Sequence, residues 1–355
     1  MKRLSLIYLG LVLSAFLFAS CEEYYQPKLE VVPGLMVVES HITNDLRQNF
    51  VKLSFAQDFY STVETKKIAG TKVDIIALGD KDIGGIESSP GYFTFPATPV
   101  PGKKYLLRIR YEKEVFETEY VLMPPIPAID SLYTKHKVEK IFRTNAYGVP
   151  TLIEVPKRTV CVDARINYQL GHYRFNTRAI LQWVFSPAPA NGPPPPPWSG
   201  WLSVYNRGLF NLAGPKEFSV FSKIRQHPVV SLDYNGQFYI GSSERVASGW
   251  ILILDAYGIT EDSYNFHENL NRQFSAEGSL FDPALTQVYG NIKCKTSPEK
   301  IVLGFFDLNS YRQYRYFLNL GTGPDTQVIQ RRLNTYPDIP DEGYEIGTRP
   351  SFWEQ

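Results

Sequence analysis

The chain has 355 residues, with 37 Lys and Arg against 36 Asp and Glu, so its formal charge at neutral pH is +1. That balance excludes a protein whose main task is to neutralise nucleic-acid phosphates, because such proteins carry a clear basic excess. A hydrophobic content of 43% and a charged content of 21% also exclude wholesale disorder. The length favours two domains. An aromatic content of 14%, beside 26 Pro and 25 Gly, favours strands and turns over helices.

The first twenty residues are typical of a secretory signal peptide. Lys2 and Arg3 precede an apolar, uncharged stretch from Leu4 to Phe18, and small residues follow it. A positive start, an apolar centre and small residues before a cleavage site are the three parts of an export signal. The apolar stretch is shorter than the ~20 residues that a membrane-spanning helix needs. We therefore expect residues 1–20 to be a cleaved signal.

The residues that end this signal resemble the lipobox of bacterial lipoproteins, with Phe18-Ala19-Ser20 in front of Cys21. By that resemblance, the mature chain starts at Cys21, whose thiol carries diacylglycerol and acyl chains such as palmitate. Burial of acyl chains is worth ~0.8 kcal/mol per CH₂, so several chains together anchor a protein stably. The alternative is an ordinary signal peptide in which the cysteine is accidental. Lipid would be the anchor, because no basic run in the linear sequence assists it.

Residues 21–34 form the expected tether, and the acidic pair that opens it has two interpretations. Glu22 and Glu23 follow the lipid-attachment cysteine directly. Such a pair resembles the surface-export tags of Bacteroidota lipoproteins. It is equally well explained as part of a solvated linker. The sequence therefore leaves open whether the protein faces the periplasm or the cell surface.

Residues 35–123 alternate short β-branched or aromatic runs with turn residues, which predicts a β-sandwich of immunoglobulin or transthyretin style. The run Lys104–Tyr111 shows the pattern best. Tyr105, Leu107 and Ile109 share one face while the arginines between them share the other, as in a half-buried strand. The fold class is therefore predicted as mainly β.

Prolines in the segment 124–130 cannot donate hydrogen bonds to a sheet, so a linker is expected there. Residues 131–330 then predict a larger, antiparallel β domain, and 331–355 an extended tail. One helix near 261–276 is inserted in this domain. Thr260 is placed to cap it, Ile259 and Tyr264 form a hydrophobic staple, and Phe266, Leu270 and Phe274 recur every four residues.

A proline-rich run over 187–197 ends in Trp198, with Trp201 close behind. Such a run adopts polyproline II and projects as a stiff loop. The functional interpretation makes Trp198 and Trp201 contact residues for a partner. The alternative is a tolerated surface insertion.

The region from Tyr264 to Leu318 resembles one family. Its residues are Tyr264-Asn265, Gln273-Phe274, Gly278-Ser279-Leu280-Phe281-Asp282-Pro283, Gly290-Asn291-Ile292 and Val302-Leu303-Gly304-Phe305-Phe306. These look like the C-terminal half of a Bacteroidota lipoprotein family known as a domain of unknown function, number 4249. The resemblance implies an outer-membrane lipoprotein encoded beside TonB-dependent transporters, with a role in nutrient uptake. It transfers no catalytic residue.

No catalytic, cofactor or metal site is expected from the motifs. The sequence lacks a Gly-x-Ser-x-Gly elbow, a Walker loop, a dinucleotide fingerprint and a Cys-x-x-Cys pair. His267-Glu268 comes nearest to a zinc helix but lacks the second histidine. We interpret His267 as a polar residue that flanks the buried face of the predicted helix.

Two cysteines remain after Cys21. Cys161 and Cys294 both fall in predicted strands of the second domain. In an oxidising envelope they could form a disulfide. They could equally be two small buried residues that never meet.

The sequence thus predicts a non-enzymatic lipoprotein of the outer membrane, held in the bilayer by acylated Cys21. Its expected partner is a TonB-dependent transporter, with no nucleic acid and no cofactor, and its ligand is not specified. The alternative is a surface adhesin or structural interaction protein, in which the Pro-Trp segment would contact the partner. An envelope hydrolase is the third class.

Overall fold

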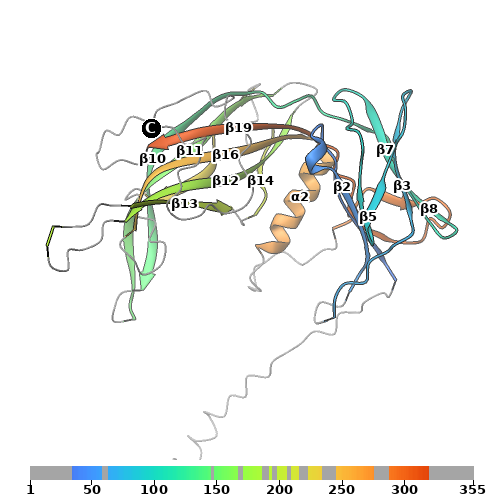
Figure 1. Ribbon diagram of the computed structural model, residues 1–355, viewed down its shortest axis with the longest axis horizontal. Helices are drawn as coiled ribbons and strands as arrows, with labels where there is room; N and C mark the ends of the chain where they lie inside the picture. The colour runs from blue at the N-terminus through green and yellow to red at the C-terminus, as the bar shows by residue number, and fades with distance from the viewer. Residues whose placement is uncertain are drawn as a thin grey trace, which may run out of the picture.

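The computed structural model describes residues 34–57, 63–144, 148–166, 171–185, 192–193, 198–205, 209–215, 223–233, 245–275 and 288–319. These residues form two β units with one α-helix between them (Figure 1). The mainly β fold class is confirmed. Among the described residues, no helix is both long and apolar enough to cross a membrane.

The N-terminal unit consists of two sheets around one hydrophobic core. The first sheet has the order β18-β1-β2-β6-β5, with β1 (Met36–His41), β2 (Phe50–Phe55), β5 (Ile86–Ser89), β6 (Tyr92–Thr94) and β18 (Val302–Phe305). The second has the order β17-β8-β7-β3-β4, with β9 paired to β7. Its strands are β3 (Lys72–Ala77), β4 (Ile83–Gly84), β7 (Lys104–Tyr111), β8 (Glu114–Thr118), β9 (Val121–Leu122) and β17 (Ile292–Cys294). A 3-10 helix, η1 (Leu46–Gln48), lies between β1 and β2.

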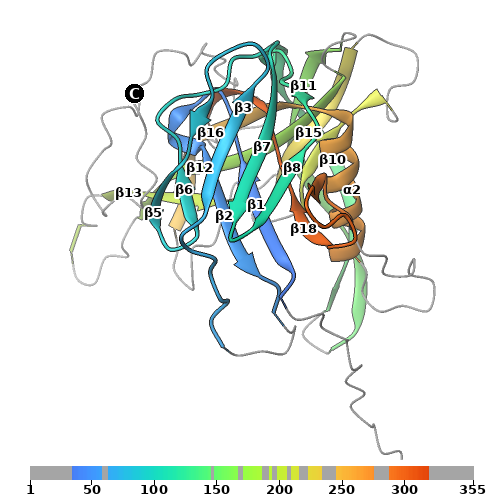
Figure 2. The same ribbon diagram turned by 90° about the vertical axis from the view of Figure 1, so that its right-hand side faces the viewer.

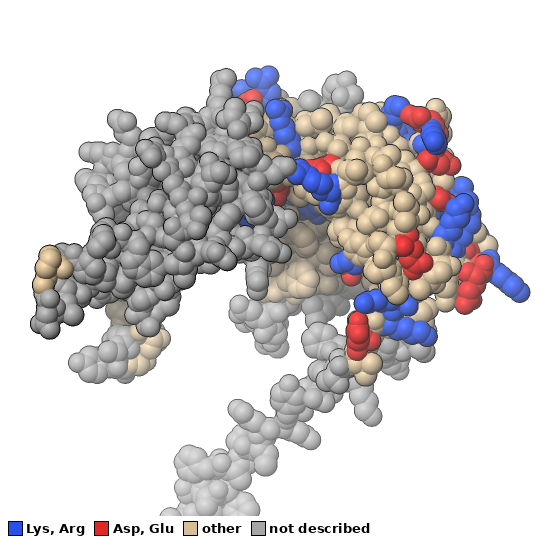
Figure 3. Space-filling model, viewed as in Figure 1, with Lys and Arg blue, Asp and Glu red and all other residues tan. Residues whose placement is uncertain are grey.

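Alternation along β7 explains how this core forms. Tyr105, Leu107 and Ile109 are buried in the core, and Arg108 and Arg110 point away from it toward Glu117 and Asp74. Both the bounds of β7 and its buried face agree with the sequence pattern. Figure 3 shows Lys and Arg interspersed with Asp and Glu over this unit, as the near-neutral composition implies.

The predicted limits of the first domain require a correction, because residues 35–123 do not complete the sandwich alone. β18 pairs in parallel with β1, with Val38 opposite Gly304, and β17 pairs with β8, with Cys294 opposite Phe116. These late strands were assigned to the second domain because periodicity identifies a strand without identifying its partner. The N-terminal unit therefore combines the first strands of the described chain with β17 and β18, and β19 (Ser310–Asn319) then returns to the C-terminal unit.

This returning segment packs backbone against backbone. Gly304 has φ +97°, and a Cβ added to it would lie 1.9 Å from the Val38 carbonyl oxygen. A Cβ on Gly290 would lie 1.5 Å from the Gly304 carbonyl oxygen. Both positions therefore require glycine, since any side chain would separate the three stacked backbones.

The C-terminal unit is a second pair of sheets. One has the order β10-β11-β15, with β10 (Ile129–Thr144), β11 (Pro150–Arg165) and β15 (Lys223–Asp233). The other has the order β13-β12-β16-β19, with β14 paired to β12. Its strands are β12 (His172–Phe185), β13 (Trp198–Tyr205), β14 (Asn211–Ala213), β16 (Arg245–Ile259) and β19 (Ser310–Asn319). Their shared core includes Val160, Val162, Tyr173, Leu252 and Leu254.

The predicted helix is confirmed as α2 (Glu261–Phe274). The Ser263 amide donates to Thr260 Oγ1 at 3.1 Å, and Ile259 and Tyr264 are buried in one cluster, so the cap and the staple both form. The buried face differs from the expected one. Phe274 is exposed, and Ser263, Tyr264 and His267 face inward. His267 is therefore part of the buried face and does not flank it.

Candidate functional site

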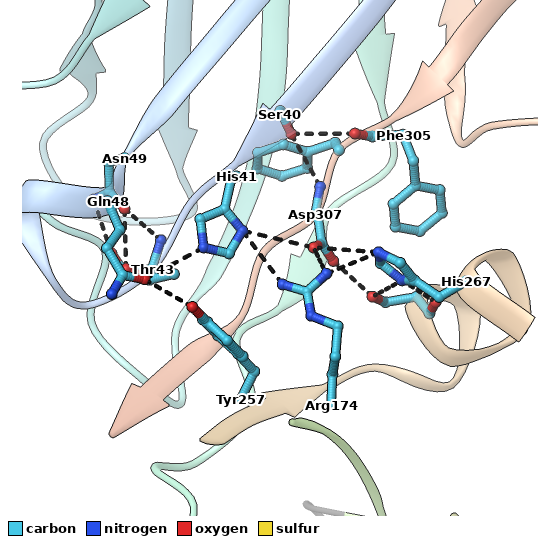
Figure 4. A network of polar contacts seen from close by, with 12 residues as sticks. Ser40, His41, Thr43, Gln48, Asn49, Arg174, Tyr257, His267, Phe305 and Asp307 are labelled. Carbon is cyan, nitrogen blue, oxygen red and sulfur yellow. Dashed lines mark hydrogen bonds and ion pairs between the residues drawn. The ribbon is translucent and has the colours of Figure 1, made fainter. Parts of the chain in front are cut away.

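A buried polar network lies where the two units meet (Figure 4). It joins the end of β1, the start of β12, β16, α2 and the segment that follows β18. At its centre are Arg174, Asp307 and His267, with Ser263 and His41 around them. The network therefore connects elements of both units.

Arg174 and Asp307 form a buried ion pair across the junction. Tyr173 and Phe175 point into the core of the C-terminal unit, so Arg174, between them on β12, faces the other way. Its Nη1 donates to Asp307 Oδ2 at 2.9 Å, and both side chains are only 6% exposed. Burial alone would raise the pKa of Asp307, but the charge of Arg174, with His267 and His41 nearby, holds that pKa well below its usual range.

Asp307 is satisfied by donors from several elements. Its Oδ1 accepts from Ser263 Oγ of α2 at 2.6 Å, and its backbone amide donates to Ser40 Oγ of β1 at 3.0 Å. Its carbonyl oxygen accepts from the Ile42 amide at 2.9 Å. One residue thus ties α2, β1 and β12 together.

The hydrogen bonds define the tautomer of His267. Arg174 Nη1 lies 2.8 Å from His267 Nε2, and a guanidinium can only donate, so Nε2 accepts. The proton is then on Nδ1, which donates to the Ser263 carbonyl oxygen at 2.7 Å. Burial lowers the pKa of His267; Asp307 opposes this shift, and the charge of Arg174 adds to it. The ring is therefore neutral.

A second layer of contacts extends the network to η1. The guanidinium of Arg174 lies over the ring of Tyr257, 4.7 Å from its centroid. Tyr257 Oη donates to Gln48 Oε1 at 3.1 Å, and His41 Nε2 lies 3.4 Å from the same oxygen. Burial, followed by the charge of Asp255, raises the pKa of Tyr257. This hydroxyl remains protonated at neutral pH and serves as a donor.

The serine, histidine and aspartate of this network do not have the geometry of a hydrolytic triad. A nucleophilic serine donates to a histidine nitrogen that can take its proton. Here Ser263 donates directly to Asp307, and the acceptor nitrogen of His267 is occupied by Arg174. Since all three side chains are buried, the network can hold the units together but presents no nucleophile to solvent.

The protonation states make the stability of the junction depend on pH. His267 has a pKa below 6.5 in the folded chain, so the unfolded chain binds a proton that the folded chain excludes. We expect the free energy of unfolding to fall as the pH is lowered from about 7 to about 5, by up to ~1.4 kcal/mol per pH unit from this group. Asp307 adds a separate loss that begins near pH ~4, because its folded pKa is depressed. Urea unfolding at stepped pH measures both.

His267→Gln is the variant that tests this assignment. Glutamine keeps a side-chain oxygen that can accept from Arg174, but it does not titrate. The slope between about pH 7 and about pH 5 should become shallower in H267Q. The groups that face His267 are Arg174, Asp307 and His41, and all three remain in the variant. An unchanged slope would show that another group produces the dependence.

A cavity of about 550 Å³ opens beside this network, between the two units. The N-terminal unit contributes Glu119, Leu122 and Lys293, and the other side is formed by His172 and the first turn of α2. Small-molecule sites commonly have volumes of ~300–1,000 Å³ and lie between domains. Side chains of both charge signs at its wall suit a small polar ligand. Within the described ranges, no three His, Cys, Asp or Glu residues are grouped to hold a metal ion.

The structure locates some of the predicted site residues. Cys21 and most of the proline-rich run lie outside the described residues. Trp198 and Trp201 are on β13, paired with Phe185 and Gln182 of β12, so their backbones belong to a sheet; the contacts of their side chains are outside the described part.

The disulfide that the sequence left open does not form, because Cys161 and Cys294 are both free, buried thiols. Cys161 is on β11 of the C-terminal unit, and Cys294 is on β17 in the core of the N-terminal unit. Because β17 belongs to the N-terminal unit, the two cysteines lie in different units. The alternative of two buried residues that never meet is therefore confirmed.

Sequence reasoning missed Arg174 and Asp307. Each is a single charge in an apolar run, Tyr173-Arg174-Phe175 and Phe305-Phe306-Asp307. A charge in a strand that is otherwise apolar indicates a buried ion pair, but the partner is 133 residues away. Only the fold could show which opposite charge it meets.

The chain is thus a mainly β protein with two sandwich-like units. A buried ion pair joins the units, and a cavity lies at their junction. Residues 22–315 match the family described as Domain of unknown function (DUF4249). The chain belongs to this family, and the resemblance seen between Tyr264 and Leu318 is confirmed. No curated protein matches the chain.

Proposed function

We propose that the protein is a non-catalytic binding component of the outer membrane, anchored through acylated Cys21, that serves a TonB-dependent nutrient transporter. The anchor is supported by the signal-like residues 1–20 and by the family match, which begins at residue 22, directly after the cysteine. The transporter is supported by the resemblance of the C-terminal motifs to lipoproteins encoded beside such transporters.

The observation that carries the binding role is the cavity between the units. Its walls come from both sandwiches, and the buried Arg174–Asp307 pair fixes the two walls relative to one another. A cavity whose walls are already fixed binds a ligand without the free-energy cost of ordering those walls. The serine, histidine and aspartate nearby are buried and already paired, which supports binding over hydrolysis.

Acyl labelling of the full chain, exported by a bacterium that makes lipoproteins, tests the anchor and the partner together. Radiolabelled palmitate should appear in the wild-type protein and be lost in Cys21→Ala. Cys294→Ala is the matched control, since that thiol is 2% exposed and no acyl transfer can reach it. An outer-membrane TonB-dependent transporter should co-purify with the wild type and with C294A, and be absent from C21A.

Two outcomes would contradict this proposal in different ways. Label that persists in C21A would remove the anchor at Cys21. Label that depends on Cys21 without any transporter in the purified material would leave a tethered protein and favour the adhesin alternative.

A further inference from the structure

The hairpin formed by β10 and β11 extends well beyond the sheet that holds its base. The two strands pair without interruption from Ser131 and Asp163 to Thr144 and Pro150. β15 pairs with β11 only as far as Lys157, so among the described residues Pro150–Pro156 and the strand opposite form a two-stranded arm. At about 3.3 Å per residue, this arm is roughly 23 Å long. Figures 1 and 2 show it projecting from the body.

The free part of the arm exposes large apolar side chains. Phe142 is 75% exposed and Leu152, directly opposite in the register, is 51% exposed, so the two share one face of the hairpin. Val138, on the same face, and Val149, at the turn, are more than half exposed. An isolated two-stranded hairpin is at best marginally stable in water. Burial of the apolar residues at its end against another surface would therefore stabilise the hairpin.

Charges of both signs lie along the arm. Residues 138–156 contain two Lys and Arg and two Glu, so the two-stranded part carries no net charge, and the other four cations of residues 133–159 lie at the base of the hairpin. Lys140 and Glu154 pair at 3.3 Å beside Phe142, and both are largely exposed. Exposed apolar side chains beside a paired Lys and Glu can lie in the interface of a membrane.

The position of the arm agrees with the proposed tether. η1 joins β1 to β2 at the upper side of the molecule in Figures 1 and 2, so β1 starts at the lower side, toward which the arm also points. Residues 21–33 number 13 and span at most ~45 Å when fully extended. A tether of this length allows a bilayer held at Cys21 to lie on the side of the arm and within its reach.

We propose that the end of the β10–β11 arm inserts Phe142 and Leu152 into the interface of the membrane that anchors the chain. This inference rests on the proposed function, because it takes the lipid at Cys21 as the first attachment. A single tether leaves the body free to tilt and rotate. The arm supplies a second attachment that sets the orientation of the cavity.

A fluorophore at the end of the arm tests the insertion. Thr144→Cys places an exposed thiol there, and the buried Cys161 and Cys294 are protected from the same label. Acylated full-length T144C, labelled with nitrobenzoxadiazole, is reconstituted in vesicles of phosphatidylethanolamine and phosphatidylglycerol. We expect emission at shorter wavelength and quenching by lipids brominated near the headgroup. Leu78→Cys, at an exposed site of the N-terminal unit, is the matched control and should show neither.

Removing the apolar end separates insertion from anchoring. T144C with Phe142→Ser and Leu152→Ser should lose the shift and still float with the vesicles, and an unchanged melting temperature would show that it folds. Flotation of T144C without any shift would overturn the arm proposal and leave the anchor intact. Failure of the acylated protein to float would overturn the anchor itself.

Discussion

Asp307→Asn is expected to destabilise the protein by about 3–5 kcal/mol, the cost of leaving a buried charge without its partner. Asparagine is nearly isosteric with aspartate, so the substitution changes the charge and leaves the packing in place. Arg174 would then keep its charge at a site that is 6% exposed, without the carboxylate that balances it. Urea unfolding followed by far-ultraviolet circular dichroism measures the loss.

The ion pair of Asp130 and Arg165 provides the matched control. It lies in the same chain at 2.9 Å, but the arginine is 70% exposed. Exposed pairs contribute ~0–1 kcal/mol, so Asp130→Asn should have little effect. The double variant Arg174→Met with Asp307→Leu should recover much of the loss, because it removes both charges and refills their volume. If D307N were no worse than D130N, the junction would not depend on this pair.

The Asp307→Asn substitution should also show how the unfolding of one unit is coupled to that of the other. Four of the five tryptophans, at positions 183, 198, 201 and 250, lie on strands of the C-terminal unit, so tryptophan fluorescence mainly follows that unit. In the wild type, fluorescence and circular dichroism should change together. In D307N they should separate, because the two sandwiches no longer share a satisfied junction.

Gly304→Ala is expected to cost about 3 kcal/mol or more, through two separate effects. A non-glycine residue with φ +97° is strained by roughly 1–2 kcal/mol. The added Cβ would also lie 1.9 Å from the Val38 carbonyl oxygen, so β18 must move away from β1. Overpacking of this kind typically costs ~1–3 kcal/mol. Circular dichroism of urea unfolding records the total.

Gly102→Ala separates the two effects. Gly102 has a similar φ of +84°, but an added Cβ has nothing within 4 Å. G102A therefore measures the backbone strain alone, and the difference from G304A is the cost of the contact with Val38. Equal losses in the two variants would contradict the close packing of β1 and β18.

Local features of the sequence predicted the elements well. The alternation of Tyr105, Leu107 and Ile109 located β7, and the cap at Thr260 located α2, because both depend on neighbours within a few residues. The inward face of α2 was predicted wrongly. Its helical period of aromatics suggested Phe274, but the junction supplies polar partners for Ser263 and His267 instead.

Features that depend on distant partners were beyond the sequence. The pairing of β18 with β1 and of Arg174 with Asp307 brings together residues far apart in the chain, and no pattern of period two or 3.6 encodes such a choice. The same holds for the cavity, whose walls come from both units.

The parallel pairing of β18 with β1 has a consequence for the order of assembly. Ser40 and Phe305 meet across 265 residues, so the first sandwich lacks an edge strand until nearly the whole polypeptide has emerged from the ribosome. The edges of β1 and β8 therefore remain unpaired until β17 and β18 have been synthesised. The N-terminal sandwich can therefore close only late in synthesis.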